Sequence, residues 1–366
     1  MTPIDLDHNA GSPLRPVAAA AMVACARVGN PASAHAAGRA ARRLLDDARE
    51  RVAARLGAHP DEVLFTSGAT EANNLAAFGL VGDGGRLQLS AIEHPCVVEP
   101  FRQLEKRGFT LDWLPVDAVG RVNVAKVSPE ARLVALMLAN HETGAVQPVA
   151  AAAAVAPVLC DAAQAIGKLP VHFHRLGVVA LTVSAHKFGG PVGVGLLLLK
   201  RGTAFAPQWF GGHQQGGRRP GTEPVMLAVG LAAALDEACE QMAGRRERWT
   251  RQRTFLVEHL SMCQLNGPPP GDPDVLPNTV NLSAPGCRTD LLLMALDLAG
   301  VRASGGSACS SGSLLPSPVL AAMGLPDDRL RSAVRLSLGP DTTDADVKEA
   351  AGRIVECVGR LGERGA

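Results

Sequence analysis

Residues 178–190 read Val178-Val179-Ala180-Leu181-Thr182-Val183-Ser184-Ala185-His186-Lys187-Phe188-Gly189-Gly190. The first six residues form a short, almost wholly apolar run, which is typical of a strand buried on both faces of a sheet. Polar side chains and glycines follow where this strand is expected to end. A lysine just past a strand end is most often a plain surface residue. Lys187 therefore needs a second observation before it indicates any chemistry.

The second observation is another apolar run that ends in a carboxylate, Leu159-Cys160-Asp161-Ala162-Ala163-Gln164. If both runs are strands, Asp161 and Lys187 lie on neighbouring strand ends. A lysine amine can form a Schiff base with the aldehyde of a phosphorylated cofactor. A carboxylate that faces the pyridine nitrogen of such a cofactor keeps that nitrogen protonated, so the ring withdraws electrons. The pair predicts an enzyme that uses a cofactor of this kind.

The composition narrows the class of protein. The 366 residues are 47% hydrophobic, which is enough for a large core and more than one domain. Lys and Arg number 36 against 35 Asp and Glu, so a small-molecule ligand is expected rather than nucleic acid or an anionic membrane. No apolar run reaches transmembrane length, residues 1–5 show no secretory signal, and the 8 cysteines form no CxxC pair. Together these features predict a cytoplasmic protein.

Short apolar runs alternate with amphipathic helical stretches along the first part of the chain. The runs are residues 63–66, 86–90, 111–116, 132–139, 158–160, 178–183 and 193–200. Several are continuous rather than alternating, which predicts a sheet covered by helices on both faces and an α/β architecture. We expect residues 16–250 to form a large domain and residues 251–366 a smaller one, with residues 1–15 packing against the small domain.

A third motif, Phe65-Thr66-Ser67-Gly68-Ala69-Thr70-Glu71-Ala72-Asn73-Asn74, joins a predicted strand to a predicted helix. Small residues and a hydroxyl at the helix start leave backbone N–H groups, and the positive end of the helix dipole, open to an anion. A capped helix needs no ligand, so the motif alone is weak. With Ser184, His186 and Thr222 as further donors, it predicts a phosphate site.

These motifs and several others resemble one family, the cysteine desulfurases. They follow one another in the order of that family from about residue 5 to about residue 340. The stretches that carry the resemblance are Gly29-Asn30-Pro31-Ala32-Ser33-Ala34-His35, residues 66–74, Ile92-Glu93-His94-Pro95, Ala139-Asn140-His141-Glu142-Thr143-Gly144, residues 161–164, residues 184–187, Arg219-Pro220-Gly221-Thr222-Glu223 and Ser307-Ala308-Cys309-Ser310-Ser311-Gly312.

The resemblance implies a pyridoxal 5'-phosphate enzyme of fold type I in the class V aminotransferase group. It implies a large domain with a mainly parallel seven-stranded sheet, a smaller C-terminal α+β domain, and a homodimer. Lys187 would bond the cofactor, and Asp161 would pair with its pyridine nitrogen. Gln164 would hydrogen-bond the ring hydroxyl, and His94 would stack on the ring and count as catalytic together with Lys187 and Cys309. The phosphate would be bound by Ala69, Thr70, Ser184, His186 and, from the other subunit, Thr222.

The resemblance assigns the substrate to Asn9, Asn140 and Arg335. Two of the implied residues have simpler explanations on local sequence alone. His94 precedes a proline and could equally be a turn histidine, and Arg335 lies in a strand-like run where a structural ion pair is the commoner role. The fork of Arg335 nevertheless suits bidentate recognition of a carboxylate.

Cys309 separates this family from ordinary aminotransferases. It lies between Gly305-Gly306-Ser307 and Ser310-Ser311-Gly312, a context too small and polar for core packing. An exposed thiol in a reducing compartment favours a reactive role, and we expect a nucleophile on a mobile loop. In the implied reaction Cys309 attacks the sulfur of L-cysteine and Lys187 moves the α-proton. The products are L-alanine and a persulfide on Cys309, which passes sulfur to an acceptor such as iron–sulfur cluster assembly.

No resident metal is expected, with Cys309 a candidate contact for a transferred iron–sulfur cluster. The chain departs from the family at Gly11-Ser12, where Thr-Thr is usual, and at Gln215-Gly216-Gly217, where Glu-Arg-Gly is usual. It also ends close behind its last predicted helix, which leaves docking of a scaffold protein open. Two other functions stay open: a lyase or aminotransferase acting on selenocysteine, cystine or another amino acid, and a cofactor-binding protein without turnover.

Overall fold

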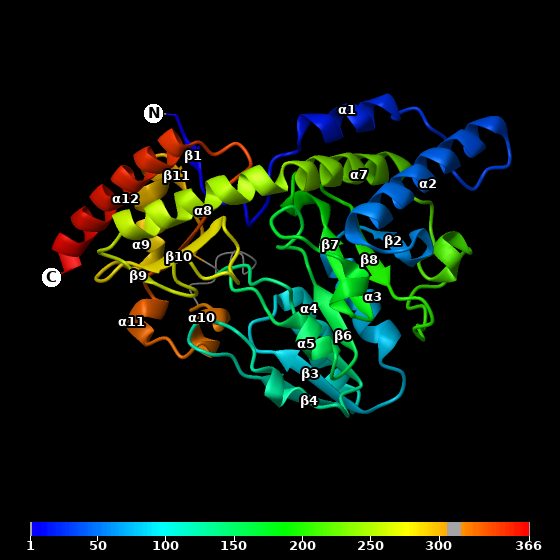
Figure 1. Ribbon diagram of the computed structural model, residues 1–366, viewed down its shortest axis with the longest axis horizontal. Coiled ribbons are helices and arrows are strands. Elements are labelled where there is room, and N and C mark those ends of the chain that lie inside the picture. The colour runs from blue at the N-terminus through cyan, green and yellow to red at the C-terminus, as the bar shows by residue number, and fades with distance from the viewer. Residues whose placement is uncertain (1, 306–315, 366) are drawn as a thin grey trace.

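The structure, a computed structural model, describes residues 2–305 and 316–365. Its largest sheet has the strand order β2-β8-β7-β6-β5-β3-β4 (Figure 1). β8 runs antiparallel to both β2 and β7, and the other neighbours are parallel. The strands are β2 (Val63–Thr66), β3 (Arg86–Ser90), β4 (Thr110–Leu114), β5 (Leu133–Ala135), β6 (Val158–Asp161), β7 (Ala180–Ser184) and β8 (Gly195–Leu199). Each predicted apolar run overlaps one of these strands, and the mainly parallel sheet is confirmed.

Helices cover both faces of this sheet, which explains why its strands are continuously apolar. Leu64 and Leu159 pack on one face against α3 (Ala69–Leu80) and α4 (Pro95–Lys106). Their strand neighbours Phe65 and Cys160 pack on the other face. That second layer consists of α1 (Pro16–Ala24), α2 (Ala36–Leu56), α5 (Val149–Ala153), α6 (Phe173–Leu176) and α7 (Val225–Glu240). Successive side chains along each strand therefore point into two different hydrophobic cores, rather than alternately into a core and into solvent.

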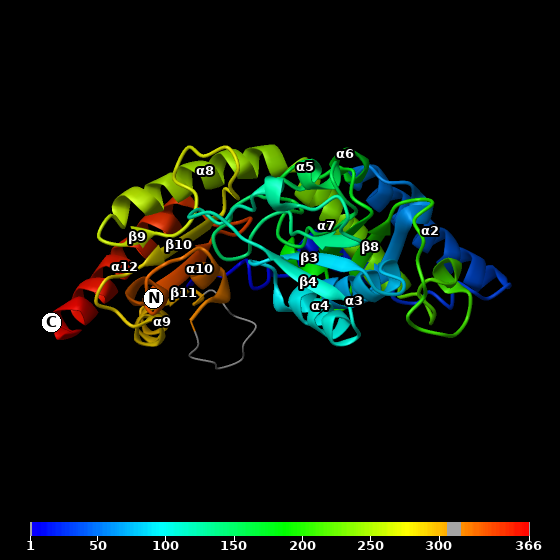
Figure 2. The same cartoon turned by 90° about the horizontal axis from the view of Figure 1, so that it is seen from below.

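The C-terminal part of the chain has a core of its own, in which Trp249, Leu256 and Ile354 are buried. α8 (Met242–His259) continues from α7 and leads into it, and Figures 1 and 2 both place this part at one end of the molecule. Its other elements are β9 (Gln264–Leu265), β10 (Thr279–Ser283), α9 (Thr289–Leu298), β11 (Val301–Arg302), α10 (Pro318–Ala322), α11 (Asp327–Leu330), β12 (Ala333–Ser337) and α12 (Asp344–Gly365).

The N-terminal strand β1 (Ile4–Asp5) pairs in parallel with β11, so the start of the chain joins the C-terminal part. β10 lies between β9 and β12 in a second, antiparallel sheet. The division of the chain into domains near residue 250 stays a prediction. After β1, residues 6–15 cross to the large sheet, where the Ser12 N–H donates to the His186 oxygen at 2.8 Å.

Strands β2, β3, β5, β6 and β7 all point the same way, because β2 and β7 are both antiparallel to β8. Their carboxyl ends therefore meet at one edge of the sheet, which is where open α/β sheets bind ligands. The motifs singled out from the sequence follow these strand ends. The fold thus gathers them at a single edge.

Strand β2 lies at one side of the sheet, and Gln215 covers part of its free edge. The side chain of Gln215 bonds both backbone groups of Phe65, accepting from the N–H at 2.6 Å and donating to the oxygen at 2.9 Å. Gln215 belongs to η4 (Gln214–Gly217) and has a positive φ of 51°, a backbone angle that residues other than glycine rarely adopt. The sequence departure noted at 215–217 thus places an amide where a neighbouring strand would otherwise sit.

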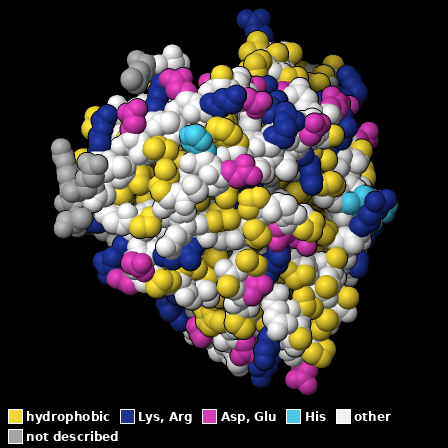
Figure 3. Space-filling view, turned by 60° about the vertical axis from the view of Figure 1, so that its left-hand side comes forward, with side chains coloured by type: hydrophobic (Ala, Val, Ile, Leu, Met, Phe, Trp, Pro, Cys, Tyr) yellow, Lys and Arg dark blue, Asp and Glu magenta, His cyan; other side chains and the backbone are white. Residues whose placement is uncertain are grey.

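Short turns of 3-10 helix complete the fold: η1 (Pro60–Glu62), η2 (Val124–Lys126) and η3 (Ala185–Lys187). At the end of η1, Glu62 accepts from the N–H groups of His59 and Arg201 and pairs with His174 Nε2 at 2.7 Å. These bonds close the turn that leads into β2. On the face shown in Figure 3, basic and acidic side chains are interspersed among hydrophobic ones. No helix within the described residues is both long and apolar enough to cross a membrane.

Candidate active site

Lys187 ends the turn η3, which follows β7 directly. Its Nζ donates to the main-chain oxygens of Asn9 at 2.8 Å and Ala10 at 3.0 Å. The crossing segment that begins in the C-terminal part of the molecule therefore holds the amine at the edge of the large sheet. This is the placement that the sequence predicts for a lysine that bonds a cofactor.

Asp161 is the last residue of β6 and is buried. Its Oδ1 accepts from the Ala163 N–H at 2.8 Å, and its Oδ2 accepts from Asn73 Nδ2 at 2.9 Å. Asn73 is held in turn, because its Oδ1 accepts from Thr182 Oγ1 on β7 at 2.8 Å. The Cys96 thiol, 3.8 Å from Oδ2, is a third donor. All three donors to Asp161 are neutral, so this carboxylate suits a cationic group of a ligand. β6 and β7 are adjacent, as expected for Asp161 and Lys187.

The predicted phosphate site lies where α3 begins. Gly68 is the N-cap and offers no side-chain cap, which leaves the first N–H groups of α3, from Ala69 and Thr70, without the usual hydroxyl partner. A Cβ at Gly195 would lie 2.6 Å from the Gly68 Cα, so a glycine at position 195 is what allows this turn to rest on β8. A Cβ built on Gly68 would lie 3.9 Å from Ser184 Oγ, which places that hydroxyl beside the turn.

Ser184 Oγ lies 2.9 Å from His186 Nδ1, so the two predicted phosphate ligands touch. Burial, with the charge of Lys187 as a smaller cause, lowers the pKa of His186 to about 4. The imidazole is therefore neutral at pH 7. Thr70 and Thr222 are exposed, as side chains that meet a ligand or a second subunit would be.

Two histidine rings lie edge to face beside this site. His94 is the N-cap of α4, where its Nδ1 accepts from the Cys96 N–H at 3.1 Å. Its ring centroid lies 5.4 Å from that of His141. His141 Nδ1 is buried and has no hydrogen-bond partner within the described residues. Burial lowers the pKa of His141 well below its usual range, and His94, Arg335 and Lys187 act in the same direction. An unpaired buried nitrogen at this place suits a polar ligand.

Gln164 and Asn9 belong to one hydrogen-bond network with a lysine that the sequence analysis missed. Gln164 Nε2 donates to the Asn9 main-chain oxygen at 3.0 Å. Gln164 Oε1 accepts from Lys168 Nζ at 2.7 Å, and Asn9 Oδ1 accepts from the same Nζ at 2.9 Å. Asn9 Nδ2 donates to Thr279 Oγ1 at 2.9 Å. The network therefore links both parts of the molecule at the site.

The two other expected substrate residues are already engaged. Arg335 lies on β12, where its Nη2 pairs with Asp7 at 2.7 Å and its Nη1 donates to the His141 oxygen at 3.1 Å. Its Nε is buried without a partner within the described residues. Asn140 Oδ1 accepts from the N–H groups of Glu142 and Thr143, both at 2.9 Å. Asn140 thus shapes the turn that presents His141, while Arg335 keeps one donor unused.

Cys309, the expected nucleophile, lies outside the described residues. The nearest described element after it is α10, whose N-cap Ser317 donates to Glu142 Oε2 at 2.6 Å. Ser317 therefore lies against the turn that carries His141. The described residues fit pyridoxal 5'-phosphate: an amine, a buried carboxylate with only neutral donors, a helix start without a side-chain cap and a buried imidazole with one unpaired nitrogen meet at one sheet edge.

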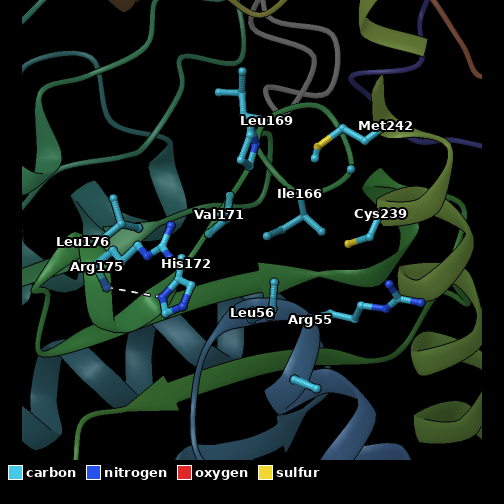
Figure 4. Close-up of a pocket in the computed structure, with 13 residues that line it drawn as sticks. Arg55, Leu56, Ile166, Leu169, Val171, His172, Arg175, Leu176, Cys239 and Met242 are labelled. Carbon is cyan, nitrogen blue, oxygen red and sulfur yellow. Dashed lines mark hydrogen bonds between the residues drawn. The ribbon is translucent and has the colours of Figure 1, made fainter. Parts of the chain in front are cut away.

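A hollow of about 510 Å³ lies elsewhere, between α2, α6 and the start of α8. Figure 4 shows Ile166 and Leu169 directed into it, together with Arg55, His172 and Cys239. None of the predicted site residues lines it. Residues 164–169 therefore separate the hollow from the candidate active site. Ile166 and Leu169 line the hollow, whereas Gln164 and Lys168 form hydrogen bonds to Asn9 in the site.

Glu93 is a buried carboxyl beside His94 whose role the sequence did not indicate. Its Oε1 accepts from the Met137 N–H at 2.7 Å, and its Oε2 has no partner within the described residues. Burial raises the pKa of Glu93 from 4.5 to about 8, so this side chain is protonated at neutral pH. A neutral carboxyl group is far less costly to bury than an unpaired charge.

We predict that Glu93→Gln changes how stability depends on pH. The folded protein keeps a proton on Glu93 that the unfolded chain loses, so the free energy of unfolding should fall as pH rises from 4.5 to about 8. Glutamine mimics the protonated form, and the variant should gain stability relative to the wild type by at most roughly 1.4 kcal/mol per pH unit in this range. Denaturant unfolding at several pH values measures the difference. Parallel curves for the two proteins would contradict the protonated state of Glu93.

The residues that the sequence analysis missed share one property. Asn73, Glu93, His141 and Lys168 act through partners that lie far away in the chain, and three of the four stand within motifs quoted for other residues. Lys168 alone carried a local signal, since it stands four residues after Gln164 in a tight turn. That spacing brings two side chains onto one face.

Fold and site together define a pyridoxal 5'-phosphate-dependent transferase of fold type I. The model of the family "Aminotransferase class-V" matches residues 4–349, and the chain belongs to this family. A cysteine desulfurase IscS of Dictyoglomus turgidum is 38% identical, over 96% of this chain and 94% of its own length. An IscS-like cysteine desulfurase of Mycobacterium tuberculosis is 40% identical, over 94% and 93%.

Solved structures agree with these relatives. A NifS-like protein superposes with a TM-score of 0.91 at 31% identity, covering 98% of this chain and 100% of its own. The structure described as SspA in complex with cysteine has a TM-score of 0.80 at 30% identity, covering 93% and 100%. The resemblance to cysteine desulfurases, the fold type and the cofactor expected from the sequence are thereby confirmed.

Proposed function

We propose that this protein removes sulfur from L-cysteine with pyridoxal 5'-phosphate and passes it on from Cys309. The observation that carries the proposal is the placement of Lys187 and Asp161 at the neighbouring ends of β7 and β6, in a chain whose relatives are cysteine desulfurases. Iron–sulfur cluster assembly is one class of acceptor that the names of the relatives suggest.

When bound, pyridoxal 5'-phosphate supplies an aldehyde carbon that bonds amines and a ring that stabilises negative charge at the α-carbon. Lys187 would hold the cofactor, and Asp161 would keep its ring nitrogen protonated. Gln164 would face the ring hydroxyl, and His94 would lie against the ring. The phosphate would be bound by Ala69 and Thr70 at the start of α3, and by Ser184 and His186.

The substrate's carboxylate would be held by Arg335, whose buried Nε has no partner within the described residues. Asn140 builds the adjoining turn, and Asn9 closes the site from the crossing segment. Lys187 Nζ takes the α-proton. The Cys309 thiolate then attacks the substrate sulfur, and the carbon–sulfur bond breaks with its electron pair left on the β-carbon. The β-carbon takes a proton, and Lys187 returns a proton to the α-carbon to give alanine. The sulfur remains on Cys309 as a persulfide.

We also propose that the active unit is a homodimer. Thr222 is exposed in the single chain, and its hydroxyl would complete the phosphate site of the partner. The segment 219–222 is fixed for this role, because Arg219 Nε pairs with Glu71 Oε1 on α3 at 2.8 Å. An assembly of this kind places each phosphate site at the boundary between subunits.

The direct test is to incubate the purified protein with L-cysteine and measure alanine release, with peptide mass spectrometry to locate any persulfide. We expect alanine and persulfide in equal amounts during the first turnover, with the persulfide on Cys309. Parallel assays with selenocysteine and cystine distinguish the other candidate substrates. A protein that binds the cofactor but releases no alanine from any of them would contradict the proposal and favour a binding protein without turnover.

A further inference from the structure

Lys168 is a second amine beside the site, and it is almost completely buried, with 5% of its surface exposed. Its Nζ lies 2.7 Å from Gln164 Oε1 and 2.9 Å from Asn9 Oδ1. Within residues 2–305 and 316–365 no carboxylate forms an ion pair with it. The charged groups that act on it, Lys187 and Arg335, are both basic.

This arrangement is costly for a residue that only fills space. Burial lowers the pKa of Lys168 well below its usual range, and the neighbouring charges of Lys187 and Arg335 lower it further. An apolar side chain of similar length would fill the same volume without this cost. The two hydrogen bonds of Nζ are therefore the feature that a methionine at this position could not supply.

Lys168 Nζ donates to both amide oxygens, whereas each amide has one accepting and one donating end. The Gln164 side chain must therefore turn its oxygen to Lys168 and its nitrogen away. Gln164 Nε2 in fact donates to the Asn9 main-chain oxygen, which also accepts from Lys187 Nζ. The same lysine fixes Asn9, whose Oδ1 is shared between Lys168 and Asn278 Nδ2 at 3.2 Å.

We propose that Lys168 is a positioning residue that fixes the orientation of the Gln164 and Asn9 side chains. With Lys168 in place, Gln164 presents its second N–H, not its oxygen, to the ring hydroxyl of the cofactor, and Asn9 keeps its main-chain oxygen against Lys187. The part that concerns the cofactor rests on the proposed function. The two hydrogen bonds from Lys168 to Gln164 and Asn9, which we call the clamp, are present in the protein without the cofactor.

The test uses Lys168→Met, which keeps the length and removes the donors. The variant should keep the cofactor on Lys187 but bind it about tenfold more weakly, because the hydrogen bond from Gln164 to the ring hydroxyl of the cofactor is lost. Its cofactor absorbance band should shift, and kcat should fall with KM for cysteine little changed. Lys348→Met, on the exposed face of α12, is the matched control and should leave all four quantities unchanged.

A double-mutant cycle with Gln164→Ala decides whether Lys168 acts through Gln164. In the Gln164→Ala background, Lys168→Met should cause little further loss of cofactor affinity, since residues in one network are not additive. Additive losses, or a Lys168→Met protein with the wild-type band and affinity, would overturn the inference. If Lys168→Met does not fold, Gln164→Glu replaces it: the carboxylate still accepts from Lys168 but has no N–H to present, so cofactor binding should again weaken.

The same cycle measured on melting temperatures of the protein freed of cofactor tests the clamp apart from the proposed function. Non-additive changes are expected for Lys168→Met and Gln164→Ala, and additive changes would overturn the clamp. A wild-type protein that binds no pyridoxal 5'-phosphate would instead overturn the proposed function. In that case the melting temperatures still decide the role of Lys168.

Discussion

Lys187→Ala is expected to lower the rate of alanine formation by about a thousandfold or more. The substitution removes the only group proposed both to hold the cofactor and to move the α-proton. The Asn9 and Ala10 oxygens that accept from Nζ lose their donor, but they lie at the edge of the site where water can replace it. The fold should therefore survive, and the measurement is alanine release at saturating cysteine.

The matched control is Lys200→Ala, which removes an exposed lysine just beyond β8. It should leave the rate unchanged. Borohydride reduction followed by peptide mapping should place the cofactor on Lys187 in the wild type and in this control. Cofactor fixed to Lys168 instead would overturn the assignment of Lys187, because Lys168 is the other amine that bonds Asn9.

Cys309→Ser is expected to reduce persulfide formation by at least about a hundredfold, since a serine oxygen cannot take over a sulfur atom. The cofactor absorbance band should stay as in the wild type, because the cofactor ligands are proposed to lie on the large sheet. The measurements are sulfide released by a reducing agent and the visible spectrum. A normal band with lost sulfur transfer separates the nucleophile from the cofactor site.

Cys263→Ser serves as the control in the same part of the chain. Burial raises the pKa of Cys263 to about 11, so this thiol is a poor nucleophile and its loss should not change sulfur release. Cys96 is the other thiol to check, because it lies near Asp161. Its Sγ lies 3.8 Å from Asp161 Oδ2, and a persulfide mapped to Cys96 would contradict the role of Cys309.

The sequence was sufficient for the parts of the fold that depend on local pattern. Each apolar run became a strand because an element covered on both faces must be apolar along its whole length. Asp161 and Lys187 could be placed together because the ends of neighbouring parallel strands meet at one edge. The reversal of β8 between β2 and β7 was not predicted, since Leu196 and Leu197 fit either direction equally well.

Side-chain partners across the chain set the limit for the site. Nothing local shows that Asn73 would bond Asp161, or that Lys168 would bond Asn9, which is 159 positions away. Asn140 stays a prediction for substrate binding, and nothing local showed that its oxygen would accept within its own turn while the neighbouring His141 keeps an unpaired nitrogen. Adjacent polar residues in a turn point in different directions, and the sequence motif does not indicate which of them faces the site.

The amide of Gln215 on strand β2 has a consequence beyond the active site. A bare strand at the border of a sheet is a template on which a second molecule can add its own strand. The Phe65 backbone cannot serve as that template, because Gln215 already bonds its N–H and its oxygen. We therefore expect Gln215→Ala, which frees both groups, to make concentrated protein more prone to aggregate.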